Sequence, residues 1–89
     1  MDRWDEAKER IRESLSIVSV VESYMTLPRK GAGLKALCPF HKEKTPSFHL
    51  FDRTNTFKCF GCQKGGDIFT FVMEFENVGF REAMEILGR

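Results

Sequence analysis

Three cysteines and one histidine are spaced in this sequence as two pairs of metal ligands. Two residues separate Cys38 from His41, two separate Cys59 from Cys62, and seventeen lie between the pairs. Two intervening residues let a tight turn aim both side chains at one point, and two such turns supply the four corners of a tetrahedral site. Because protein ligands fill every corner, none is open to water or substrate. The spacing therefore predicts one structural Zn²⁺.

Other interpretations of the cysteines are less well supported. Three is an odd number, so a disulfide framework would leave one thiol unpaired. A thioredoxin-like dithiol at Cys59 and Cys62 would have to open a helix in a βαβ unit, for which the chain has no room. The order Cys-His then Cys-Cys also excludes the two-Cys, two-His finger, whose histidines come last. The remaining histidine, His49, lacks ligand spacing, and we expect it at the surface of a strand.

Helices are predicted at both ends of the chain. Hydrophobic spacing predicts one helix over residues 2–15 and a second, short one over 16–25, with Ser16 as its cap. The apolar run in the second segment also has the composition of a strand, which is the alternative structure for that segment. Residues 67–88 contain two further helical patterns, and Asp67 suits the start of the first.

Short strands and turns are predicted in the central segment, residues 26–66, which would be the zinc ribbon. The expected strands are residues 26–30, 33–38, 47–51 and 56–59, with residues 63–66 as a glycine-ended connection. Each ligand pair would then occupy a tight turn at a strand end. The predicted fold is α+β, a small zinc-ribbon domain with an antiparallel β-sheet flanked by short helices at both ends. We expect residues 1–89 to form a single zinc-binding domain.

The charge is uneven along the chain, although the net charge is only +1. Residues 29–64 carry eight Lys or Arg against two Asp or Glu, whereas both helical ends are acidic. This segment remains basic even with three thiolates on a zinc ion, which favours an anionic partner. No apolar run approaches the roughly 20 residues of a membrane helix, and the acidic N-terminus is unlike a secretory signal. We therefore expect a cytoplasmic location and no membrane partner.

Five segments of the chain form a distinctive set of motifs, residues 38–41 (CPFH), 43–48 (EKTPSF), 57–62 (FKCFGC), 65–71 (GGDIFTF) and 80–83 (FREA). Together they closely resemble the N-terminal zinc-binding domain of bacterial DNA primase. The resemblance covers almost the whole chain. It implies a zinc ribbon that engages single-stranded template DNA and helps choose where an RNA primer begins. It also implies that this is the N-terminal fragment of a longer primase, with its RNA polymerase domain and helicase-binding domain downstream. The polymerase domain would be a partner in cis or in trans, and the replicative helicase an indirect one.

Basic residues interleaved with aromatic ones are the expected contacts to DNA. Phosphates are bound by Lys or Arg, and bases stack on aromatic or guanidinium planes. Strand alternation places Lys35 and Lys58 on the face opposite Cys38 and Cys59. Most of the nine phenylalanines are expected in the core, with Phe51 and Phe60 exposed. The candidate DNA-binding residues are Arg29, Lys30, Lys35, Lys44, Lys58 and Phe60. A solvated basic face without a partner is the alternative for any single lysine.

The two alternative classes of function are a protein-interaction module and an enzyme. A zinc-ribbon protein-interaction module would dock on another domain or protein through its acidic helical ends. An enzyme would need an open metal site or a nucleophile beside a base, and the sequence offers neither. We therefore expect the nucleotidyltransferase active site of a primase to lie outside these residues.

Overall fold

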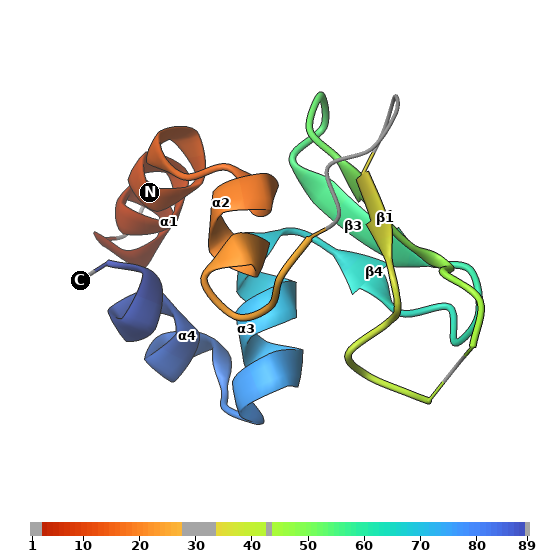
Figure 1. Cartoon of the computed structure of the whole chain (residues 1–89). Coiled ribbons are helices and arrows are strands. Elements are labelled where there is room, and N and C mark those ends of the chain that lie inside the picture. Colours follow the sequence, from red (N-terminus) through yellow and green to blue (C-terminus); the bar gives the residue numbers. More distant parts are fainter. Residues whose placement is uncertain (1–2, 28–33, 43, 89) are drawn as a thin grey trace.

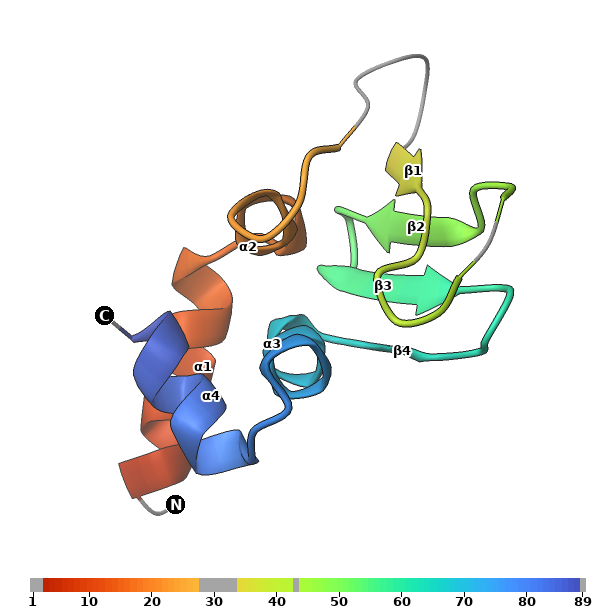
Figure 2. The ribbon, with the colours of Figure 1, turned by 60° about the horizontal axis from the view of Figure 1, so that its bottom comes forward.

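The computed structural model describes residues 3–27, 34–42 and 44–88, which form a sheet and helices packed in layers (Figure 1). The elements are α1 (Arg3–Ser14), α2 (Ile17–Glu22), β1 (Leu34–Ala36), β2 (Phe48–Phe51), β3 (Thr56–Cys59), β4 (Gly65–Gly66), α3 (Ile68–Glu76) and α4 (Phe80–Leu87). Figure 2 shows α2 and α3 between the sheet and the outer pair, α1 and α4. The expected α+β class, with an antiparallel sheet and helices at both ends of the chain, is confirmed. None of the described helices is both long and apolar enough to span a bilayer.

The four strands form one antiparallel sheet in the order β1-β2-β3-β4. Lys35 on β1 lies opposite His49 on β2, which in turn lies opposite Lys58 on β3. Side chains alternate along a strand, so these three share one face of the sheet. Their neighbours Phe48 and Leu50 are buried on the other face. The sheet thus has an outer face that is polar and basic and an inner face that is apolar.

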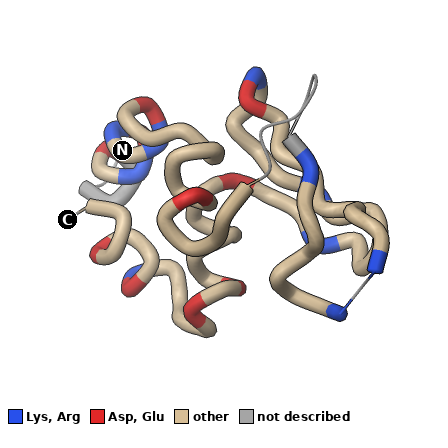
Figure 3. The backbone as a smooth tube through the Cα atoms, viewed as in Figure 1, with Lys and Arg blue, Asp and Glu red and all other residues tan. Residues whose placement is uncertain are grey.

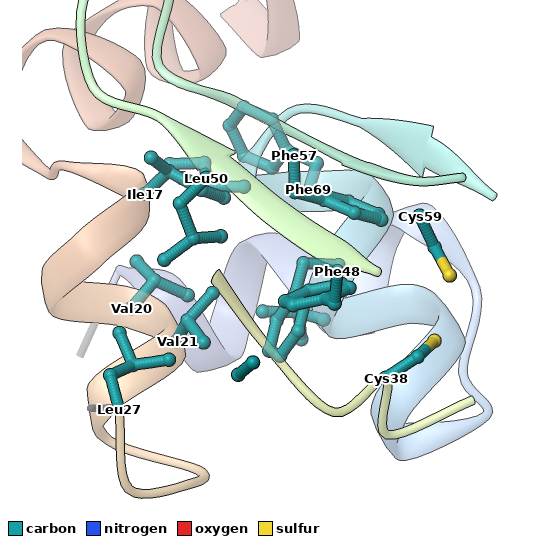
Figure 4. Packing of buried hydrophobic residues seen from close by; sticks show 14 of the residues in the cluster. Ile17, Val20, Val21, Leu27, Cys38, Phe48, Leu50, Phe57, Cys59 and Phe69 are labelled. Atoms are coloured by element: carbon teal, nitrogen blue, oxygen red, sulfur yellow. The ribbon is translucent and has the colours of Figure 1, made fainter. Parts of the chain in front are cut away.

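The core lies between the inner face of the sheet and the helices α2 and α3 (Figure 4). Its largest fully buried side chains are Phe48, Phe57, Phe69, Phe71, Ile17, Ile68, Val21, Val72 and Cys59. Ser16 caps α2 as expected, since its Oγ accepts the Ser19 N–H at 3.0 Å. A helix of six residues is marginal alone, so the buried face of α2 stabilises it.

Two predictions about the central segment are wrong or incomplete. Residues 63–66 were expected to be a simple connection, but Gly65 and Gly66 form β4 and pair with β3. Two glycines carry no side-chain pattern that could indicate a strand. Of the strand expected over residues 26–30, Thr26 and Leu27 are irregular, and the rest lies outside the described residues. Leu27 is buried in the core without joining the sheet.

Polar side chains connect the first helices to the rest of the fold. Asn55, in the turn between β2 and β3, accepts the Ile17 N–H at 2.6 Å and donates to the Leu15 carbonyl at 3.0 Å. Asp67 caps α3 by accepting the Thr70 N–H at 3.1 Å, as its position in the sequence predicts. Arg12 on α1 donates to the same carboxylate at 2.7 Å. These contacts fix the helical ends relative to the sheet.

Candidate metal centre

The four predicted ligands converge at one end of the sheet, where their ligand atoms all lie within 4.8 Å of one another. The Sγ atoms of Cys38 and Cys62 are 3.8 Å apart, and the Cys59 Sγ lies 3.9 Å from the His41 Nδ1. Two sulfurs at tetrahedral corners with Zn–S of ~2.3 Å are about 3.8 Å apart. Figure 4 shows the sulfurs of Cys38 and Cys59 pointing toward each other. The donor set therefore fits one tetrahedral zinc ion, which would join the two turns.

Each ligand pair lies in a turn whose backbone donates to a ligand sulfur. The Phe40 N–H points at the Cys38 Sγ at 3.3 Å, and the Cys62 N–H points at the Cys59 Sγ at 3.5 Å. Such bonds offset the negative charge of thiolates and orient them toward a metal. We call these turns the first knuckle (residues 38–41) and the second knuckle (residues 59–62).

The first knuckle is anchored to the core by Phe40. Its ring centroid lies 6.0 Å from that of Phe48, 5.9 Å from that of Phe57 and 5.6 Å from that of Phe71. These rings belong to β2, β3 and α3, so one aromatic side chain connects the knuckle to both the sheet and a helix. The second knuckle needs no such anchor, because it continues β3 directly.

Ser47 and Gly61 complete the surroundings of the ligands. The Ser47 Oγ lies 3.4 Å from the Cys59 Sγ, within hydrogen-bonding range of sulfur. A Cβ atom added to Gly61 would lie 2.9 Å from both the Ser47 Oγ and the His41 Nε2. The glycine thus leaves the space that the imidazole and the hydroxyl occupy. These roles were not predicted, although the glycine inside the second ligand pair and the serine at the start of the expected strand over residues 47–51 were available signals.

The two buried thiols differ in acidity. Burial raises the pKa of the Cys38 thiol to about 12. Burial also acts to raise the pKa of Cys59, but donation from the Ser47 hydroxyl and the N–H groups of Cys62 and Gly61 outweighs it and lowers that pKa to about 6. Cys59 is therefore the more readily formed thiolate. Binding of Zn²⁺ would displace the proton from Cys38, because zinc coordinates thiolates.

A family model described as the CHC2 zinc finger matches residues 4–89. This chain belongs to the CHC2 zinc finger family. The family name agrees with the ligand order in the two knuckles, Cys-His followed by Cys-Cys, and the family match together with the converging ligand atoms confirms the expected zinc cofactor.

Proteins similar to this CHC2 zinc finger include longer DNA primases. The DNA primase of Mycolicibacterium smegmatis is 53% identical over 79 residues, which are 88% of this chain and 12% of that protein. The DNA primase of Thermotoga maritima is 42% identical over 84 residues, 94% of this chain and 15% of that protein. A crystal structure of the zinc-binding and RNA polymerase domains of Aquifex aeolicus primase matches with a TM-score of 0.86 and 36% identity, covering 92% of this chain and 20% of that chain. The chain thus spans a small part of these relatives, and the resemblance seen in the sequence is confirmed.

The candidate DNA-binding residues of this CHC2 zinc finger lie mainly on the side of the molecule that carries the sheet. Figure 3 shows Lys and Arg along the sheet and the knuckles, whereas Glu residues lie on α2, α3 and α4, and α1 carries both charges. Lys35 is exposed, and Lys58 is half-buried with its Nζ donating to the Gln63 carbonyl at 3.1 Å. Lys44 is exposed in the loop between the first knuckle and β2. Arg29 and Lys30 lie outside the described residues.

An aromatic cluster occupies the outer face beside these lysines. Phe60 is 55% exposed and Phe51 is 41% exposed, as expected. The His49 ring centroid lies 5.0 Å from that of Phe60 and 6.3 Å from that of Phe51. His49 was expected at the surface without a role, because only the register of β2 against β1 and β3 puts it between two lysines. We call His49, Phe51 and Phe60 the outer aromatic cluster.

Proposed function

We propose that this chain is the non-catalytic zinc-binding module of a bacterial DNA primase. It binds the single-stranded DNA template and helps select the start site of RNA primer synthesis in the cytoplasm. The observation that carries the proposal is the similarity to the zinc-binding part of the Aquifex primase, over 92% of this chain at a TM-score of 0.86. Protein ligands fill all four zinc corners, so primer synthesis itself belongs to a polymerase active site in another domain.

Contact with template DNA would take place on the outer face of the sheet. Lys35 and Lys58 flank His49 there, and Phe60 exposes an aromatic ring at the edge of the second knuckle. Lysines bind phosphates without regard to sequence, whereas exposed rings stack on unpaired bases. Arg29, Lys30 and Lys44 would extend the phosphate-binding surface beyond the strands. The zinc ion would keep the knuckles, and hence this face, rigid.

A salt series measured by fluorescence anisotropy tests the DNA contact. With about three to five phosphate contacts, a plot of log affinity against log salt should have a slope of about −2 to −4, at ~0.7 per contact. Replacing Lys35 by Ala should weaken binding and make the slope shallower by about 0.7, and adding Lys58→Ala should double that change. Arg10→Ala, on α1, removes the same charge from the helical side and serves as the matched control. A flat slope, or equal binding by wild type and the double variant, would contradict the proposed surface.

Docking on another protein domain is the second candidate, and the acidic charge of the helical side favours it. The Glu positions of α2, α3 and α4 lie on the helical part of the backbone, away from most basic positions of the sheet (Figure 3). Their charge suits a basic partner surface, and the RNA polymerase domain of the same or a neighbouring primase would be the partner to test. Both functions can coexist, because they use opposite sides of the module. Separate titrations with single-stranded DNA and with the polymerase domain distinguish them, and Lys35→Ala should affect only the first.

A further inference from the structure

Two neighbouring side chains of the outer aromatic cluster are nearly parallel. The rings of His49 and Phe51 are inclined by only 13°, and their centroids are 6.3 Å apart. They occupy alternate positions of β2, which are separated by about 6.8 Å in an antiparallel strand. Stacked bases lie about 3.4 Å apart, so two rings with one base between them are about 6.8 Å apart. The centroids of the His49 and Phe51 rings are separated by nearly that distance.

We propose that His49 and Phe51 form a slot for one unpaired base of single-stranded DNA, which stacks between the two rings. The inference rests on the proposed function, to which it adds a defined binding subsite. A base within a duplex is already stacked on both faces, so the slot would favour single strands over duplex DNA.

Neighbouring groups hold the imidazole in place. The His49 Nδ1 lies 3.1 Å from the Ser47 carbonyl oxygen. A carbonyl oxygen only accepts, so Nδ1 is the donor and the ring is held by a backbone group next to the metal centre. The Phe60 ring also contacts the imidazole, with the centroids 5.0 Å apart and an interplanar angle of 78°. The imidazole is therefore positioned in advance, which lowers the entropy cost of binding a base.

Phosphates on either side of such a base would meet the lysines. Lys35 and Lys58 lie opposite His49 on the two adjacent strands, each separated from it by about 5 Å, the spacing of neighbouring strands. Single-stranded DNA is typically bound by this combination of a stacking ring and flanking positive charge. The slot would thus place one base at the centre of the basic face.

Leucine substitutions in the slot separate stacking from charge. Phe51→Leu and His49→Leu remove one ring each, and we expect each to weaken binding of a fluorescein-labelled oligodeoxythymidine about tenfold, with an unchanged salt slope. Phe51→Trp should retain wild-type affinity, because indole also stacks. Phe75→Leu is the matched control, since Phe75 on α3 is 38% exposed and lies outside the sheet. Zinc content and melting temperature show whether each variant is folded.

Fluorescence of 2-aminopurine reports the stacking directly. An oligonucleotide with one such base should lose fluorescence on binding the wild type, and the loss should be smaller with Phe51→Leu. The wild type could bind DNA with the lysine-dependent salt slope while Phe51→Leu and His49→Leu bind DNA as tightly as the wild type. That result would contradict the base slot and leave the proposed function standing. If the wild type binds no single-stranded DNA, both are wrong.

Discussion

Gly61 shows how closely the metal centre depends on one residue that is not a ligand. Its backbone passes beside the imidazole of His41 and the hydroxyl of Ser47, at a point where a Cβ would lie 2.9 Å from an atom of each. A flexible side-chain end could move aside, but His41 is held by its bond to the metal once zinc is present. Ser47 is similarly constrained, because its hydroxyl lies 3.4 Å from the Cys59 sulfur. An added methyl group therefore has to displace a ligand or a group that orients one.

We expect Gly61→Ala to lower the zinc affinity by at least ~10-fold, the scale seen when groups that orient metal ligands are disturbed. Competition with a chromogenic chelator measures this affinity. Gly79→Ala is the matched control, because nothing lies within 4 Å of a Cβ added there. Equal zinc affinities for the two variants would show that the second knuckle tolerates a side chain and that the steric argument fails.

At the scale of elements, the turn between β2 and β3 connects the sheet to the helices at the start of the chain. Asn55 has a φ of 60°, a left-handed conformation that asparagine tolerates better than most residues. Its side chain is hydrogen-bonded to two backbone groups between α1 and α2. These are the N–H of Ile17, the first residue of α2, and the carbonyl of Leu15, the residue after α1. The Asn55 side chain thus satisfies the Ile17 N–H at the start of α2 from a segment far away in the sequence. The local Ser16 cap binds a different N–H, that of Ser19.

Replacing Asn55 by Ala should destabilise the fold by about 2–4 kcal/mol, combining lost hydrogen bonds to buried backbone groups with left-handed strain. Asn77→Ala is a close control, since Asn77 also has a left-handed φ, 57°, at the end of α3. Urea unfolding gives the free energy of unfolding of each variant. The difference between the two values isolates the contribution of the Asn55 hydrogen bonds, which we expect to be about 1–3 kcal/mol. A difference near zero would mean that the turn does not hold the helices.

The elements also show where sequence patterns stop being informative. The helix α3 was predictable because Ile68, Phe71 and Val72 follow helical spacing and are buried. Phe75 continues that spacing, but it is 38% exposed and its ring contacts Tyr24. The apolar stripe of α3 therefore extends past the edge of the core. The metal ligands were predictable because two-residue spacing is a local property. The roles of Asn55 and His49 were not, because they depend on register and on contacts between segments far apart in the sequence.

At the scale of the whole molecule, two parts with different charge share one core. The sheet and knuckles carry the basic surface, and the helices carry most of the acidic one (Figure 3). The aromatic rings around Phe40 join these parts, because they connect the first knuckle to the sheet and to α3. A change at the metal centre is therefore transmitted to the core through packed side chains rather than confined to the knuckles.

Removal of zinc should consequently unfold the chain rather than loosen only one end. A structural zinc site contributes about 10–16 kcal/mol in small zinc-binding peptides, whereas whole domains are stable by about 5–15 kcal/mol. A chain of 89 residues buries a modest core, so that core cannot make up the difference. Circular dichroism should show loss of a cooperative melting transition in the presence of a strong chelator, and its return on adding Zn²⁺ but not Mg²⁺. A chelated, metal-free chain that still melted cooperatively near the original temperature would show that the helical side and the sheet form a stable core without the metal.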